Sequence, residues 1–203
     1  MCKFNPEIHH RRSIRLKEYD YSQAGLYFIT ICTQNRERLF GETENGEMIL
    51  NNAGQMVEKW FHELENKFAN ITCREHITMP NHTHFIIQNV NVGADLCVCP
   101  DGAGESADMG VHVKEGAHAK TGEHTSGEHT GSPLRAMIQW FKTMTTNEYI
   151  RHVKQDGWAP FPGKLWQRNY YEHIIRDEQS YLRIADYIIN NSLNWLKDDY
   201  YVQ

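Results

Sequence analysis

The sequence ITCREHITMPNHTHFIIQN, residues 71–89, predicts two β-strands joined by a tight turn. Residues with β-branched side chains flank Met79-Pro80-Asn81, and proline and asparagine are typical turn residues. We therefore expect strands at 71–78 and 82–89. Because strand side chains alternate between the two faces of a sheet, His82 and His84 should project from the same face.

The segments before this hairpin predict a third strand, an edge hairpin and a helix. Residues 25–33 are rich in β-branched and aromatic side chains, which favours a central strand. Two short edge pieces, 39–41 and 48–50, are joined through Asn45-Gly46, a strong hairpin signal. A helix capped by Asn52 should follow. Its apolar face would consist of Met56, Val57, Trp60, Phe61 and Leu64, which recur at helical spacing.

The segments after the hairpin predict two more helices with a strand between them. Ser132-Pro133 is typical of a helix start, residues 165–176 favour a strand, and a helix should run from residue 177 or 178 to 191. The order of elements predicts an α+β fold. We expect a ferredoxin-like or RRM-like antiparallel sheet with the helices packed on one face.

Length and composition favour one domain over residues 1–203, with a basic arm at 1–24. No apolar run reaches the length of a membrane span, and the first residues lack the apolar centre of a signal peptide. We therefore expect a cytoplasmic protein without a membrane partner. The five cysteines are an odd number and are mostly scattered, which argues against a disulfide framework.

Residues 90–132 predict a mobile, low-complexity insertion. The segment is rich in glycine and carries seven acidic residues against two lysines, so it alone accounts for the net charge of −5. Cys97 and Cys99 are close together but lack the second pair of a typical zinc site. The histidines of the segment permit metal capture, but repeat slippage in a solvated tether explains them more simply. They are His112, His118, His124 and His129.

The two histidines of the 82–89 strand offer two ligands for a divalent metal, which needs a third group from elsewhere in the fold. Tyr187 and Asn191 lie four residues apart on the last expected helix, so both should project from one face of it. A metal, an oxygen ligand and a phenol nucleophile could meet if this helix packs near the histidines.

Several motifs resemble the REP-associated tyrosine transposases, a branch of the single-tyrosine HUH transposases. They are SIRL at 13–16, YFIT at 27–30, MPNHTH at 79–84, WQRNYYEH at 166–173 and YIINN at 187–191. The resemblance extends from about Arg11 to Trp195, apart from the insertion. The chain departs from the pattern at Thr83, where a hydrophobic residue is usual, and at Ser192, where relatives often have proline.

The resemblance implies that His82, His84 and Asn191 hold Mg²⁺ or Mn²⁺, which polarises a scissile phosphate. Tyr187 would attack that phosphate and form a 5′-phosphotyrosine intermediate with a free 3′-OH. The implied partner is a single-stranded DNA hairpin such as a short palindromic repeat, and the enzyme would act as a monomer or a homodimer.

The candidate DNA contacts fall into two groups. The arm residues are expected to bind the backbone of a hairpin, although a solvated basic arm explains them equally well. The later residues are expected to stack on bases or pair with phosphates, although Trp166 fits a core position as well. The arm residues are Arg11, Arg12 and Arg15, and the later ones are Trp166, Arg168 and Tyr171.

Two other functions remain open from the sequence. The first is a DNA hairpin-binding regulator that keeps the fold but transfers no strand. The second is a metal-dependent hydrolase of small phosphoesters, including a histidine-triad nucleotide hydrolase. The histidine-triad pattern requires a third histidine at the next alternate position, which is Ile86 here.

Overall fold

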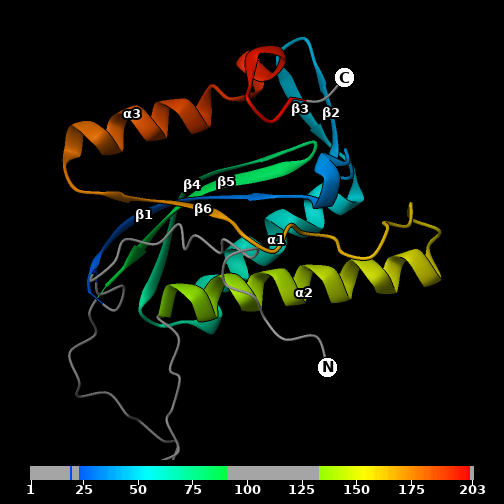
Figure 1. Ribbon diagram of the computed structural model, residues 1–203, viewed down its shortest axis with the longest axis horizontal. Helices are drawn as coiled ribbons and strands as arrows, with labels where there is room; N and C mark the ends of the chain where they lie inside the picture. Colours follow the sequence, from blue (N-terminus) through cyan, green and yellow to red (C-terminus); the bar gives the residue numbers. More distant parts are fainter. Residues whose placement is uncertain (1–18, 20–22, 91–132, 202–203) are drawn as a thin grey trace, which may run out of the picture.

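The computed structural model describes residues 19, 23–90 and 133–201 of the chain (Figure 1). The expectations for most of the basic arm and for the insertion, including Cys97 and Cys99, lie outside the described residues. Within the described part, no helix combines the length and the apolar character that crossing a membrane requires.

The described residues form six strands, three α-helices and two short 3-10 helices. The strands are β1 (Gly25–Cys32), β2 (Gly41–Glu44), β3 (Glu47–Leu50), β4 (Ile71–Met79), β5 (His82–Asn89) and β6 (Tyr171–Ile175). The α-helices are α1 (Asn52–Lys67), α2 (Pro133–Gln155) and α3 (Glu178–Ile189), and the 3-10 helices are η1 (Gln34–Arg36) and η2 (Ser192–Lys197).

Four strands form one antiparallel sheet in the order β4-β5-β1-β6, and β2 pairs with β3 in a separate hairpin. Without that hairpin, the 3-10 helices and the final helix α3, the chain order is β-α-β-β-α-β, and the first of these four strands lies between the third and the fourth. This is the ferredoxin-like arrangement. The predicted α+β class and antiparallel sheet are therefore confirmed.

The helices cover both faces of the sheet, whereas the sequence led us to expect them on one face only. The larger core cluster contains residues of α1 and α2 packed on Tyr27, Ile29 and Phe85. The smaller cluster packs α3 on the opposite face, where Phe28 and Ile86 project. Figure 1 shows α1 and α2 on one side of the sheet and α3 on the other. The one-sided arrangement was therefore wrong.

Two element boundaries also differ from the expected ones. Asn51, not Asn52, caps α1, because its side-chain oxygen accepts a hydrogen bond from the Gly54 amide at 2.9 Å. The last strand covers only residues 171–175 of the expected 165–176. Trp166 lies before it and forms only an isolated β-bridge with Thr33, the residue that follows β1.

The β2–β3 hairpin lies beside η2 near the carboxyl end of the described chain (Figure 1). Asn45 and Gly46 both have positive φ angles, of 51° and 83°, as a two-residue hairpin turn of this hand requires. A Cβ atom at Gly46 would lie 2.7 Å from the Cδ2 atom of Leu193 in η2. The hairpin thus supports the segment that follows α3.

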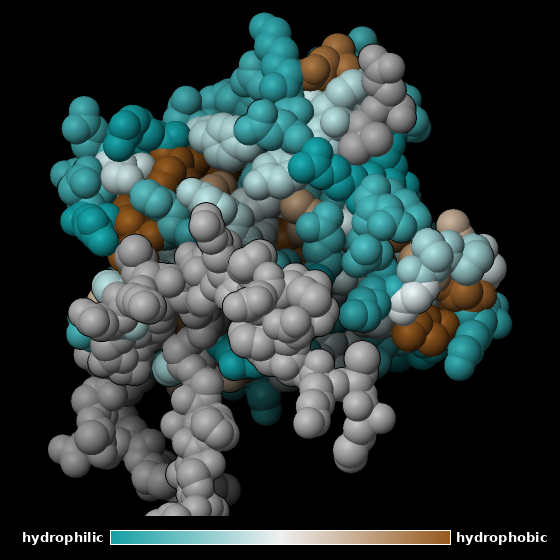
Figure 2. All heavy atoms as spheres, in the orientation of Figure 1, coloured by the Kyte–Doolittle hydropathy of each residue, from teal (hydrophilic) through white to brown (hydrophobic). Residues whose placement is uncertain are grey.

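The face shown in Figure 2 is mainly hydrophilic, and its exposed apolar side chains form small separate groups. Single exposed apolar residues of this kind are normal on protein surfaces.

Candidate active site

His82 and His84 lie on β5 and project from the face that α3 covers. Their side chains are almost fully buried, with exposed fractions of 0% and 1%, and their Nε2 atoms are 2.9 Å apart. The ring of Phe28 on the neighbouring strand stacks on His84, with 5.4 Å between ring centroids. The alternation of side chains along the strand therefore brings the two imidazole rings together on one face of the sheet.

Asn81 fixes the tautomer of His82. The Asn81 amide nitrogen donates to the backbone carbonyls of Arg36 and Tyr200, at 3.2 and 2.8 Å. Its oxygen must therefore face His82 Nδ1, which lies 2.8 Å away and donates its proton to that oxygen. This arrangement leaves the lone pair of His82 on Nε2, as a metal ligand requires.

A side-chain hydrogen bond also holds His84, because the hydroxyl oxygen of Thr30 lies 2.8 Å from His84 Nδ1. Burial, and to a smaller extent the positive charge of Arg36, lower the pKa of His82 to about 3. Burial also lowers the pKa of His84 well below its ordinary value. Both imidazoles are therefore neutral at physiological pH, the form in which histidine binds a metal.

Tyr187 on α3 lies against His84, with 5.2 Å between ring centroids. Its hydroxyl lies 3.1 Å from His84 Nε2 and 3.2 Å from an oxygen of Asp198, to which it donates. Burial raises the pKa of Tyr187, and the negative charge of Asp198 raises it further. The phenol therefore keeps its proton at neutral pH, while 41% of the residue remains exposed to an incoming substrate.

Asn191 lies just after the end of α3 and is 1% exposed. Its amide nitrogen donates to Asp198 at 2.9 Å. Its side-chain oxygen is buried and has no hydrogen-bond partner among the described residues. Because a buried oxygen without a partner is unfavourable, this atom is suited to bind a cation.

Asp198 belongs to the site although the sequence analysis did not single it out. It follows η2, and its carboxylate lies with the ligand nitrogens of His82 and His84 in a group whose atoms are all within 4.8 Å of one another. Two imidazole nitrogens and a carboxylate form a donor set that fits a divalent metal, and the Asn191 side chain is bonded to that carboxylate. A weak signal was available, because Asp198-Asp199 is an acidic pair in a short aromatic tail.

The residues predicted to contact DNA lie in different parts of the chain, and only some of them are in the described part. Tyr171 is 51% exposed on β6, and its ring lies 6.2 Å from Phe28, which is also 6.2 Å from Tyr187. Arg168 is exposed in the loop before β6. The residues of the arm, Arg11, Arg12 and Arg15, lie outside the described part of the chain.

Trp166 is a core residue, so the expectation that it stacks on a DNA base was wrong. It is only 4% exposed and packs between Phe40 and Phe141. Its indole N–H donates to the hydroxyl of Thr145 at 2.8 Å. The ring therefore has no free face for a base.

Comparisons with known proteins found a relative in sequence and several similar structures. The chain is 37% identical over 203 residues to an uncharacterized protein of Haemophilus influenzae strain Rd, with 98% of both chains covered. No protein-family model matches it.

The chain is structurally similar to a REP-associated tyrosine transposase bound to a REP hairpin, with 16% identity, a TM-score of 0.49 and coverage of 92% of this chain and 75% of that chain. A candidate transposase of Deinococcus radiodurans R1 has 13% identity, a TM-score of 0.42 and coverage of 87% of this chain and 97% of that chain.

Proposed function

We propose that this chain, which belongs to the same family as the Haemophilus influenzae protein, is a metal-dependent enzyme that nicks and joins single-stranded DNA at hairpins. One observation carries the proposal. The hydroxyl of Tyr187 lies 3.1 Å from His84 Nε2, beside the point where His82 Nε2 and the Asp198 carboxylate converge. A nucleophile next to a cation site is the arrangement that phosphoryl transfer to a side chain requires.

His82, His84 and Asp198 would hold the cation, and the unpartnered oxygen of Asn191 would complete the set. The resemblance indicates Mg²⁺ or Mn²⁺. Such a cation supplies charge that polarises the scissile phosphate and stabilises its additional negative charge in the transition state. Nitrogen and oxygen donors together suit Mn²⁺ better than Mg²⁺, which prefers an all-oxygen environment.

Tyr187 would attack the phosphorus through its phenolic oxygen. A phosphorus–oxygen bond to Tyr187 forms as the bond to the 3′ oxygen of the preceding nucleotide breaks, which leaves a 5′-phosphotyrosine and a 3′-OH. The phenol already donates a hydrogen bond to Asp198, so this carboxylate is placed to take the proton. The reverse reaction rejoins the strand, and no external energy source is needed because one phosphoester replaces another.

Exposed groups near the tyrosine would bind the DNA strand. Tyr171 lies on the same side of the sheet as Tyr187 and offers an exposed ring for base stacking. Lys142 donates from α2 to the backbone carbonyls of residues 167–169 and thereby holds the loop that carries Arg168. We further propose that Arg11, Arg12 and Arg15 contact the hairpin backbone. A substrate in genomic DNA would place the protein in the cytoplasm.

The proposal is tested by incubating the full chain with end-labelled hairpin oligonucleotides and Mn²⁺, followed by a denaturing gel. We expect a covalent protein–DNA adduct that is lost in Tyr187→Phe. Tyr181→Phe is the matched control, because it removes another phenol of α3 that bonds to Glu75 instead. Asp198→Asn should reduce adduct formation by about 100-fold or more, because it removes the proton acceptor and a cation ligand.

Three outcomes would contradict this proposal. An adduct that persists in Tyr187→Phe would exclude Tyr187 as the nucleophile. Tight hairpin binding without any adduct would favour a regulator that has kept only the fold. Hydrolysis of small phosphoesters in the absence of DNA would favour a hydrolase.

A further inference from the structure

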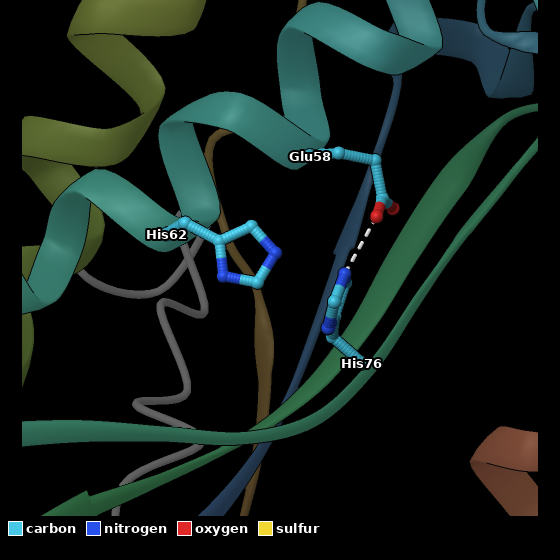
Figure 3. A group of neighbouring side chains, drawn as sticks. All are labelled: Glu58, His62 and His76. Carbon is cyan, nitrogen blue, oxygen red and sulfur yellow. Dashed lines mark hydrogen bonds and ion pairs between the residues drawn. The ribbon is translucent and has the colours of Figure 1, made fainter.

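A second group of possible metal ligands lies on the other face of the sheet. Glu58 and His62 are four residues apart on α1, and His76 lies on β4. Their ligand atoms all lie within 4.8 Å of one another. Figure 3 shows the three side chains pointing toward one another across the gap between the helix and the strand. His76 Nε2 is 2.6 Å from a carboxylate oxygen of Glu58.

A β-bulge in β4 places His76 on the α1 side. Cys73 pairs with Ile87 and His76 pairs with Phe85, so β4 has one more residue than β5 between these two pairs. Without the bulge, residues three apart on a strand would face opposite sides of the sheet. With it, both Cys73 and His76 face α1, and the Cys73 thiol contacts the carbonyl of Phe61.

Neighbouring side chains hold the group in position. The ring of Phe61 packs on His76, with 4.3 Å between centroids and 30° between planes. Glu58 also bonds to the side chain of Thr78. The side chains of Glu58 and His76 are 27% and 20% exposed, whereas His62 is exposed. The group is therefore half enclosed, and solvent can reach it from the His62 side.

We propose that Glu58, His62 and His76 form a zinc-binding site that fastens α1 to β4. Two imidazoles and one carboxylate are a known tetrahedral ligand set for Zn²⁺, with a water in the fourth position. The nitrogen donors disfavour Mg²⁺ and Ca²⁺, which take oxygen ligands. Since β5 directs Phe85 toward α1 and His84 toward α3, this site is separate from the one beside Tyr187.

Zinc binding would replace the hydrogen bond between Glu58 and His76. Burial raises the pKa of Glu58, but the hydrogen bond and the charge of His76 outweigh this effect, and the pKa is lowered overall. The carboxylate is therefore ionised at neutral pH and ready to bind a cation. Because unfolding separates the helix from the strand, zinc should stabilise the folded chain.

The test uses the full chain, freed of metal with a chelator, and Zn²⁺ or Co²⁺ without DNA. Affinity is measured by competition with a chromophoric zinc chelator, and geometry is measured by the visible absorption of bound Co²⁺. The main variant is His62→Ala, which removes a ligand at an exposed helix position where folding should be unaffected. The matched control is His173→Ala, an exposed histidine on β6. The control is needed because other histidines of the chain can also bind zinc.

We expect one Zn²⁺ of the wild-type protein to lose at least about tenfold in affinity in His62→Ala, while Zn²⁺ at His82, His84 and Asp198 keeps its affinity. The absorption of tetrahedral Co²⁺ and the rise in melting temperature with zinc should fall in the same variant by the share that this site contributes. Glu58→Gln, which keeps a hydrogen-bonding side chain, should behave likewise, and His173→Ala should match the wild type. Equal zinc affinity and equal Co²⁺ spectra in His62→Ala and His173→Ala would overturn the proposal.

Discussion

Asn81 directly precedes His82 in the sequence and also sets the tautomer of that imidazole. Its amide group is held by two backbone carbonyls, one from Arg36 and one from Tyr200. This orientation presents an acceptor to His82 Nδ1 and directs the lone pair of Nε2 toward His84. One asparagine thus connects the β4–β5 turn, η1 and the carboxyl-terminal segment to the orientation of a single imidazole.

Asn81→Ala is predicted to weaken Mn²⁺ binding about 10- to 100-fold, because outer partners of metal-binding histidines have effects of this size. The affinity can be measured by titration with electron paramagnetic resonance of free Mn²⁺. Asn66→Ala, which changes an exposed asparagine on α1, serves as the control. Unchanged Mn²⁺ affinity in a folded Asn81→Ala protein would show that the tautomer of His82 does not depend on this amide.

The two helices on one face of the sheet are joined by Glu148 of α2. Its carboxylate accepts hydrogen bonds from Lys59 at 2.6 Å and from the Trp60 indole at 2.7 Å, both on α1. Burial raises the pKa of Glu148, but these hydrogen bonds outweigh burial and the pKa lies below its ordinary value of 4.5. A lowered pKa in the folded state means that the charged carboxylate stabilises the fold.

Glu148→Gln is therefore predicted to lower the free energy of unfolding by about 1–2 kcal/mol at neutral pH. The stabilisation is present above pH 4.5 and is lost as the pH falls through the lowered pKa of the folded state. The difference between variant and wild type should thus shrink on acidification. Urea denaturation at several pH values measures this difference in the free energy of unfolding, and Glu47→Gln, at an exposed position, is the control. A difference that is constant with pH would exclude this role of the charge.

Gly54 lets α1 approach the chain that leads into the β2–β3 hairpin. A Cβ atom at this position would lie 2.3 Å from the backbone oxygen of Phe40 and 2.7 Å from the Cδ2 atom of Leu50. Alanine normally stabilises a helix interior by about 1 kcal/mol relative to glycine. Here the contact with a backbone oxygen outweighs that gain, since the helix would have to move.

Gly54→Ala is accordingly predicted to lower the melting temperature, with a loss of about 1–3 kcal/mol in the free energy of unfolding. Gln55→Ala, at the exposed neighbouring position, should raise stability slightly or leave it unchanged. Thermal unfolding followed by circular dichroism compares the two. A stabilised Gly54→Ala protein would contradict the close packing of α1 on this segment.

The sequence was sufficient to predict the elements and residues whose positions follow from the alternation of side chains along a strand or from the 3.6-residue turn of a helix. The alternation along β5 brought His82 and His84 to one face, and the helix period brought Tyr187 toward them. Asp198 follows a 3-10 turn that has no such period, so only the folded chain shows its position. The side of the sheet that α3 covers is also not a local property. The continuous apolar run Phe85-Ile86-Ile87 is a sequence signal for burial on both faces of β5, which our expectation of a one-sided sheet did not take into account.

At the scale of the whole molecule, His84 and Tyr187 of the same chain are in contact, so one chain can supply both groups of the proposed site. The sequence alone left open whether a partner subunit supplies the tyrosine. If each chain acts alone, then a mixture of His84→Ala and Tyr187→Phe proteins should form no covalent adduct with a hairpin. The measurement is the same denaturing gel. Recovery of adduct in the mixture would show that chains exchange the α3 helix.

The central claim is that Tyr187 becomes covalently bound to DNA beside the cation held by His82 and His84. It is tested most directly by mass spectrometry of the protein after reaction with a hairpin and Mn²⁺ and digestion with protease and nuclease. The account predicts a nucleotide attached through phosphate to the peptide that contains Tyr187, and none when the metal is removed by a chelator. A nucleotide attached to Tyr170, Tyr171 or Tyr200 instead, or a hairpin bound with metal present and no attached nucleotide, would contradict it.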